Sequence, residues 1–123
     1  MNKVEINRGN LLREFAERIK KTYGGISLNI SDVVEALNSN EKVDEGLKKH
    51  IEKIIASLVL LEQKILVEKK LTDKQTLHLL NRKINNIKSL RSYLVLAERK
   101  PDHSIIVAID RLNNSLLALF AEA

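Results

Sequence analysis

The chain has 123 residues, a length that suits one domain. It contains no cysteine, which excludes disulfides, thiolate metal ligands and cysteine nucleophiles, and its 44% apolar and 30% charged residues are the balance of a globular protein rather than a disordered one. The net charge of +5 permits acidic or nucleic-acid partners without selecting one, and the scarcity of glycine (4) and proline (1) favours long helices with few connections.

The N-terminal residues alternate between apolar and polar side chains. Val4 and Ile6 are the apolar positions. The polar positions around them are Lys3, Glu5 and Asn7. A period of two is typical of a strand with one buried face, so a short strand is expected over residues 3–7, although a frayed terminus would show much the same pattern.

Two helices separated by a glycine pair are expected next. Over residues 10–23, apolar side chains recur every three or four positions, which is the pattern of an amphipathic helix. Gly24 and Gly25 are expected to end this helix, because glycine readily takes the left-handed conformation that closes one. A shorter helix is expected over 31–38, and the polar residues at 38–40 mark a soft boundary within a single domain of residues 1–123.

A long helix is predicted from about Glu41 to Lys70. Its seam residues repeat at intervals of three and four, as in a coiled coil, and they are Leu47, Ile51, Ile54, Leu58, Leu61 and Ile65. The apolar surface is widened by Ile55, Val59, Leu60, Leu66 and Val67. The helix is therefore expected to pack against several neighbours. Gly46 costs a helix about 1 kcal/mol relative to alanine, so the chain could kink there.

A further helix is predicted over residues 73–99. Thr72 and Gln75 have the spacing of a capping box, in which each side chain bonds to the other residue's backbone N–H. The connection from the preceding helix is short, so the two long helices are expected to lie antiparallel as a helical hairpin.

Pro101 is expected to end that helix, and Asp102 or Ser104 to cap the last one, over about 104–120. The predicted fold class is therefore all-α: a helical bundle of four to five helices built on a long antiparallel helical hairpin.

No pattern typical of catalysis or metal binding stands out. His50, His78 and His103 lie far apart in the sequence, so a zinc site would need three segments to converge. The carboxylates, Glu62 and Glu68 among them, have basic neighbours and are interpreted as a solvated helix face. We therefore expect no enzymatic activity, no metal, no cofactor and no small-molecule substrate.

The sequence has neither the apolar stretch of a signal peptide nor an apolar run near the roughly 20 residues that span a bilayer. A cytoplasmic location without membrane insertion is expected.

The wide aliphatic helix faces favour a non-catalytic protein-interaction module, such as a regulator, an adaptor or a neutralising partner. A protein partner or self-association as a homodimer is expected. The candidate interface consists of the seam residues Leu47, Ile51, Ile54, Leu58, Leu61 and Ile65, together with Arg91. Arg91 and Lys83 lie at the edges of an apolar stripe, where they could pair with Asp110 or Glu98, or with an acidic partner chain.

The alternative is a DNA-binding regulator. The order of strand, helix, glycine pair and helix over about the first 40 residues resembles the ribbon–helix–helix arrangement of small bacterial repressors and plasmid-transfer accessory proteins. The resemblance implies that the strands of two chains pair and enter the major groove. The DNA-contacting residues would be Lys3, Glu5 and Asn7.

Overall fold

A computed structural model describes residues 3–39, 42–72 and 74–122, and it describes side chains for these residues except 3–9, 71 and 75. The described chain is all-helical, as predicted. Its four helices are α1 (Lys3–Ser39), α2 (Glu45–Leu71), α3 (Lys74–Arg99) and α4 (His103–Ala121).

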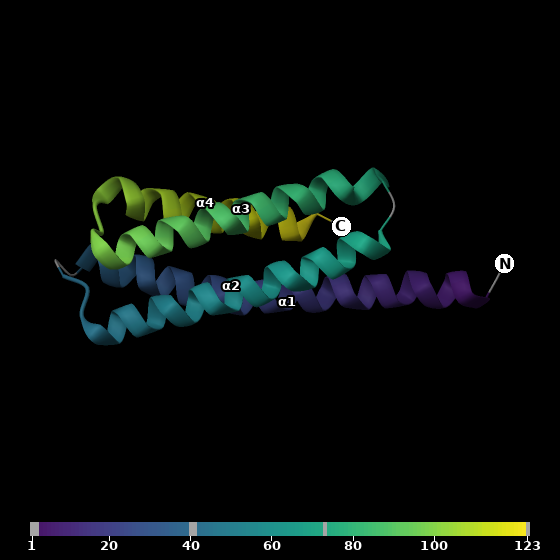
Figure 1. Ribbon diagram of the computed structural model, residues 1–123, viewed down its shortest axis with the longest axis horizontal. Coiled ribbons are helices and arrows are strands. Elements are labelled where there is room, and N and C mark those ends of the chain that lie inside the picture. Colours follow the sequence, from purple (N-terminus) through teal and green to yellow (C-terminus); the bar gives the residue numbers. More distant parts are fainter. Residues whose placement is uncertain (1–2, 40–41, 73, 123) are drawn as a thin grey trace.

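The four helices lie side by side along one axis, and the chain reverses direction at each connection (Figure 1). Each helix packs against the next along the chain, and α4 also packs against α1. Every helix therefore has two helical neighbours, and each keeps an outward side. The N-terminal part of α1 extends beyond the ends of the other helices (Figure 1).

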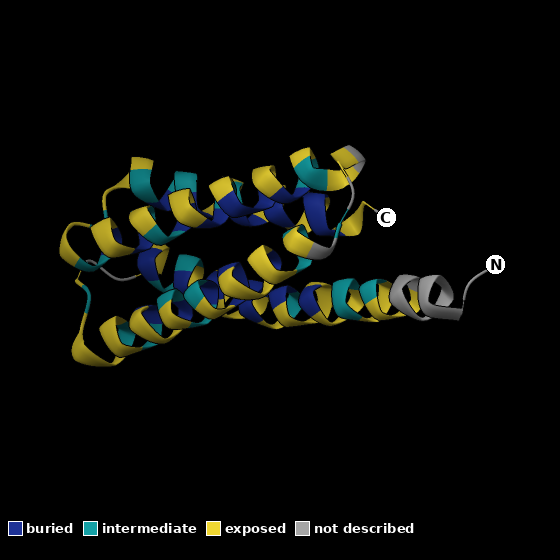
Figure 2. Ribbon diagram, turned by 45° about the vertical axis from the view of Figure 1, so that its right-hand side comes forward, coloured by how far each residue is buried: buried dark blue, intermediate teal, exposed yellow. Residues whose placement is uncertain are grey.

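The core between the helices is almost entirely aliphatic. Each helix turns one face inward, and its residues recur there at intervals of three and four. Figure 2 shows the buried residues on the inner sides of the helices and the exposed ones on the outer sides. Fully buried examples, from all four helices, are Ile30, Leu58, Leu94 and Leu116.

Two aromatic rings lie within this core. Tyr23 of α1 and Phe120 of α4 stack with their ring centroids 5.0 Å apart. The Tyr23 hydroxyl donates a hydrogen bond of 2.7 Å to Oδ1 of Asn113, which is also buried. Because a buried phenol needs a partner, this bond fixes α1 and α4 in one relative position. Burial also raises the pKa of Tyr23 far above its usual value.

The structure corrects two predictions for the N-terminal region. Residues 3–7 belong to α1 and do not form a strand, and Gly24 and Gly25 lie inside the same helix without a positive φ. A lone strand would leave its backbone groups without a ladder partner, whereas a helix pairs them internally. The apolar stripe also continues past the glycines through Ile26 and Ile30, and burial of these side chains outweighs the roughly 1 kcal/mol that each glycine costs a helix.

The ends of α2 also differ from the sequence prediction. Asp44 caps the start: its Oδ1 accepts a 2.7 Å hydrogen bond from the Leu47 N–H. Gly46 therefore lies in the first turn and does not kink the helix. Thr72 closes the other end, because its hydroxyl donates to the Glu68 carbonyl at 2.7 Å and its backbone N–H donates to the Lys69 carbonyl. Gln75, the other half of the predicted capping box, has its side chain outside the described residues.

The boundary between α3 and α4 agrees with the prediction. α3 ends at Arg99, two residues before Pro101. Asp102 caps α4, and its Oδ1 accepts hydrogen bonds from the Ile105 N–H at 3.1 Å and from the Ser104 hydroxyl at 2.6 Å. Both bonds lower the pKa of Asp102, and the bond from Ser104 has the larger effect. The predicted soft boundary at 38–40 falls at the end of α1, and residue 40 lies outside the described part of the chain.

Candidate interaction surface and buried polar sites

The predicted interface residues of α2 lie inside the molecule. The seam residues Ile51, Ile54, Leu58, Leu61 and Ile65 are each at most 2% exposed. Leu47 is partly buried and packs against the same core. In the folded chain the five buried residues contact its own helices and are closed to a partner. A heptad seam has the same appearance in the sequence whether its partner is another chain or the same one.

A second apolar face lies on the outward side of α2. Leu60, Leu66 and Val67 are 59%, 42% and 49% exposed. They belong to a row of residues that again recur at intervals of three and four. We call this row the outer stripe, and it consists of Ala56, Val59, Leu60, Gln63, Leu66 and Val67. Figure 2 shows exposed residues along the outer side of the helices. The sequence identified most of these residues as apolar surface. It did not show that α2 has just two helical neighbours, which leave this side uncovered.

Exposed charged residues border the outer stripe at both ends. Glu52 precedes it together with Lys48, Lys49 and Lys53, and Lys70 follows it. Glu52 and Lys70 are 18 residues apart, which is five turns of an α-helix, so they lie on the same face.

Elsewhere in the described chain, α3 exposes the adjacent pair Val95 and Leu96 at 42% and 47%, and single exposed residues include Leu28 of α1 at 70%. Single exposed leucines are common on protein surfaces and need no partner.

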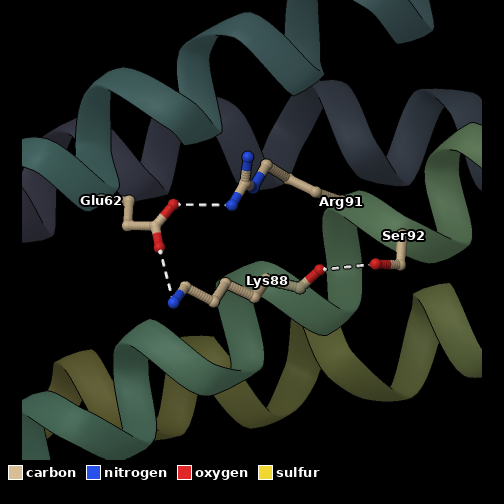
Figure 3. Close-up of polar contacts among 4 residues, drawn as sticks. All are labelled: Glu62, Lys88, Arg91 and Ser92. Carbon is tan, nitrogen blue, oxygen red and sulfur yellow. Dashed lines mark hydrogen bonds and ion pairs between the residues drawn. The ribbon is translucent and has the colours of Figure 1, made fainter.

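Arg91, the remaining predicted interface residue, belongs to an ion cluster between α2 and α3 (Figure 3). Its Nη2 donates a 2.7 Å hydrogen bond to Oε2 of Glu62, and Lys88 Nζ lies 3.7 Å from the other carboxylate oxygen. Arg91 therefore pairs with Glu62 rather than with Glu98 or Asp110. The prediction that Glu62 is solvated was wrong: the residue is 8% exposed.

This cluster fixes α2 to α3. Both carboxylate oxygens of Glu62 face a basic side chain, but the 2.7 Å bond from Arg91 is a short charge-assisted hydrogen bond, whereas Lys88 at 3.7 Å makes a looser ion pair. Arg91 also keeps a buried Nε without a hydrogen-bond partner in the described structure. Removal of Arg91 would leave Glu62 buried with one exposed lysine as its counter-ion, so we assign the pair a structural role.

Lys83 is buried at the end of the bundle where α4 ends. It is 8% exposed, and its Nζ lies 4.8 Å from the centre of the Phe120 ring, within the range of a cation–π contact. Burial lowers the pKa of Lys83, while the carboxylates of Glu68 and Glu122 raise it. Burial also raises the pKa of Glu68, and Lys83 lowers it. The two residues therefore compensate each other's charge in part, and neither is simply part of a solvated face.

Two of the recesses at the surface are distinguished by their lining residues. One, of about 190 Å³, opens beside Lys83 and is lined by residues of both charges, including Glu17 and Lys20. It is smaller than the roughly 300 Å³ at which sites for small molecules begin. The other is a wide, open groove of about 710 Å³ between α3 and α4, lined by Tyr93 and Arg111 among others.

The three histidines do not come together as a metal site in the described residues. The histidines lie on three different helices, His50 on α2, His78 on α3 and His103 on α4. In the part of the chain that the structure describes, no group of three His, Cys, Asp or Glu residues could hold a metal ion.

The alternative DNA contacts, Lys3, Glu5 and Asn7, lie on α1, and their side chains are outside the described residues. Without the strand, the ribbon–helix–helix arrangement that would place them in a groove is not formed. DNA binding is then favoured by the net charge of +5 alone.

By length and composition, α4 could cross a membrane. It is also a core helix of the bundle, and its inward face buries Ile106, Ile109 and Leu116. Core helices often pass the same test, so this property is weak evidence for a membrane span.

No protein-family model matches the chain, and neither a curated protein nor a solved structure matches it. Its own surface is therefore the guide to its function. The most distinctive feature of the described surface is the outer stripe of α2.

Proposed function

We propose that the chain is a non-catalytic protein-interaction module, a regulator, adaptor or neutralising partner, which binds through the outer stripe of α2. The observation that carries this proposal is the exposure of Leu60, Leu66 and Val67 within about two turns of one helix face. Burial of apolar surface is worth roughly 25 cal/mol per Å², so a partner that covers this face gains free energy. Apolar patches bordered by polar residues commonly mark association sites.

The packing of α2 against the helix behind it also suits association. We infer that the bundle is built on the antiparallel hairpin of α2 and α3, with the Glu62–Arg91 pair fixing one helix to the other. The seam at 47–65 then stabilises the fold, and the outer stripe remains for a partner. A surface held rigidly in its binding conformation loses little entropy when it binds.

Site-specific photo-crosslinking in the cell that produces the chain would test this proposal. A photoreactive phenylalanine derivative at position 60 samples the outer stripe, and the same group at position 28 is the matched control, because Leu28 is exposed but lies outside it. We expect a defined protein adduct from position 60 and none from position 28.

A second change makes the readout specific for the apolar contact. Leu66→Glu places a charge in the stripe without touching the crosslinker, and it should abolish the adduct at position 60. Equal adducts from positions 28 and 60, or no adduct from position 60, would refute the proposal.

A further inference from the structure

We propose that Lys83 is a nucleophilic amine that forms an imine with small, neutral aldehydes in the recess at one end of the bundle. The site includes no residue of the outer stripe, so it is independent of the proposed function. Three features of the molecule support it: the burial of the Lys83 amine, the recess beside this amine and the charges around the recess.

The recess lies at the end of the bundle where α2 ends, α3 begins and α4 ends (Figure 1). Lys83 lines it and is 8% exposed, and its Nζ lies 4.8 Å from the centre of the Phe120 ring, which also lines it. The recess has a volume of about 190 Å³. A cavity of roughly 150 Å³ holds a molecule of the size of benzene, so an occupant of a few heavy atoms fits.

The amine of Lys83 lacks a polar partner. In the part of the chain that the structure describes, its Nζ makes neither a hydrogen bond nor a direct ion pair, and its contact is with the face of the Phe120 ring. Most buried polar groups do have a partner, because burial costs them their bonds to water. A lysine ammonium has three N–H donors and no acceptor, so an occupant of the recess should offer it an oxygen that accepts a hydrogen bond.

The charges around the recess favour a neutral occupant. Its lining carries three carboxylates, Glu17, Glu68 and Glu122, and two basic side chains, Lys20 and Lys83. An anion would add a fourth negative charge, and a cation would be repelled by the two lysines. An aldehyde is neutral, its oxygen accepts hydrogen bonds, and its carbon reacts with amines.

Burial also makes the Lys83 amine a better nucleophile. Removal from water disfavours the charged form and lowers the pKa of Lys83, an effect that the carboxylates of Glu68 and Glu122 oppose in part. More of the residue is therefore neutral at a given pH than in an exposed lysine. The neutral amine is the form that attacks carbonyl carbons.

The reaction is balanced without an oxidant or a reductant. The nitrogen lone pair forms a bond to the carbonyl carbon, and the carbon–oxygen bond then breaks as the C=N bond forms. Counted from the ammonium, the nitrogen gives up two of its three protons, and both leave with the carbonyl oxygen as water. The iminium product has the same positive charge in the same place, so the Phe120 ring and the nearby carboxylates stabilise it as they stabilise the ammonium.

Reductive trapping on the full, folded chain tests the proposal. Propanal is the probe, sodium cyanoborohydride converts any imine into a stable secondary amine, and peptide mapping by mass spectrometry locates it. Lys74 is the reference, because it is an exposed lysine of the same helix. At neutral pH we expect Lys83 to be labelled at least about tenfold faster than Lys74, since an ordinary lysine is neutral in only about one molecule in 2,500. Labelling of Lys83 at the rate of Lys74 or more slowly would refute the proposal.

Three variants connect the labelling to Lys83 and to the recess. Lys83→Arg keeps a cation against Phe120 but cannot form an imine, so the fast labelling should disappear while that of Lys74 stays the same. Ala16→Phe places a large side chain in the lining of the recess and should remove the preference for Lys83. Ala118→Phe is the matched control on the exposed side of α4, and it should react like the wild type. Circular dichroism checks that each variant is folded.

Two other aldehydes test the size and the charge of the occupant on the unmodified chain. Naphthaldehyde is too bulky for the recess and glyoxylate is an anion, so neither should prefer Lys83 to Lys74. Unfolding in urea should also make the two lysines equal with propanal. A preference for Lys83 that persists in urea, in Ala16→Phe or with glyoxylate would overturn the inference, because the recess and its charges would then not be its cause.

Discussion

The two faces of α2 have nearly the same pattern in the sequence and opposite environments in the fold. Ile51, Leu58 and Ile65 on the inward face are fully buried, whereas Leu60 and Val67 on the outward face are about half exposed. Both rows repeat at intervals of three and four. The comparison shows that periodicity identifies apolar faces of a helix, while the number of neighbouring helices decides which face is covered.

The largest expected difference between the two faces is in stability. Leu58→Ala should lower the free energy of unfolding by about 2–5 kcal/mol, because it leaves a cavity in the core. Leu60→Ala, only two residues away, should lower it by less than about 1 kcal/mol, because the side chain is largely in solvent already. Urea unfolding of both variants measures the difference, and equal losses would contradict the assignment of the two faces.

The ion cluster at the edge of the inward face should give the next largest effect. Arg91→Ala should destabilise the chain by about 2 kcal/mol, because Glu62 loses its direct hydrogen bond while it stays buried. Lys88→Ala should cost less than about 1 kcal/mol, since the Lys88 side chain is 60% exposed. Thermal unfolding measures both losses.

Self-association provides a separate readout for Arg91. Arg91→Ala should associate like the wild type if the residue has a purely structural role. A loss of association without a loss of stability would assign Arg91 to the interface instead.

A smaller gain in stability is expected at an exposed position of α1. Gly25→Ala should stabilise the chain by about 1 kcal/mol, because a Cβ at this position meets no atom within 4 Å and alanine is the better helix former. Gly24→Ala should behave in the same way. A loss of stability in urea unfolding would instead indicate that the glycines take the left-handed conformation that the sequence suggested.

The smallest effect is expected at the start of α4, on the solvent side. The pKa of Asp102 is lower in the folded chain than in the unfolded one, so its contribution to stability is present at neutral pH and is lost as the pH falls through the folded-state value. Asp102→Asn keeps a capping side chain and removes the titrating group. Melting temperatures from pH 6 to pH 2 should therefore fall less steeply for the variant than for the wild type, and parallel curves would contradict the role of Asp102.

Much of the fold could be predicted because its signals are local. The helical class, the end of α3 before Pro101 and a cap at Asp102 or Ser104 depend on residues within a few positions of each other, and the structure has Asp102 as the cap. The strand at 3–7 and the break at Gly24–Gly25 were predicted from equally local signals and were wrong. In α1 the burial of side chains on both sides of the glycines, such as Tyr23 and Ile26, outweighs the local preference.

The candidate site was less predictable than the fold. The sequence separates Leu60, Leu66 and Val67 from the seam residues, but it does not tell which of the two sets is exposed. Glu62 was missed as a buried acid because its partner, Arg91, lies on the next helix, 29 positions away in the chain. The sequence did place a carboxylate directly after the seam residue Leu61, and this position suggests burial. The suggestion becomes informative when a basic residue is known to face the carboxylate.

The sequence by itself determined that this chain is helical, which residues are apolar and where several of the helices begin and end, because these properties depend on propensity, periodicity and capping over short distances. The tertiary structure alone decided which face of α2 is buried, that α1 continues through its glycines and that Glu62 meets Arg91. These depend on which helices lie next to each other, and the free energy of that packing is a sum over residues that are far apart in the chain.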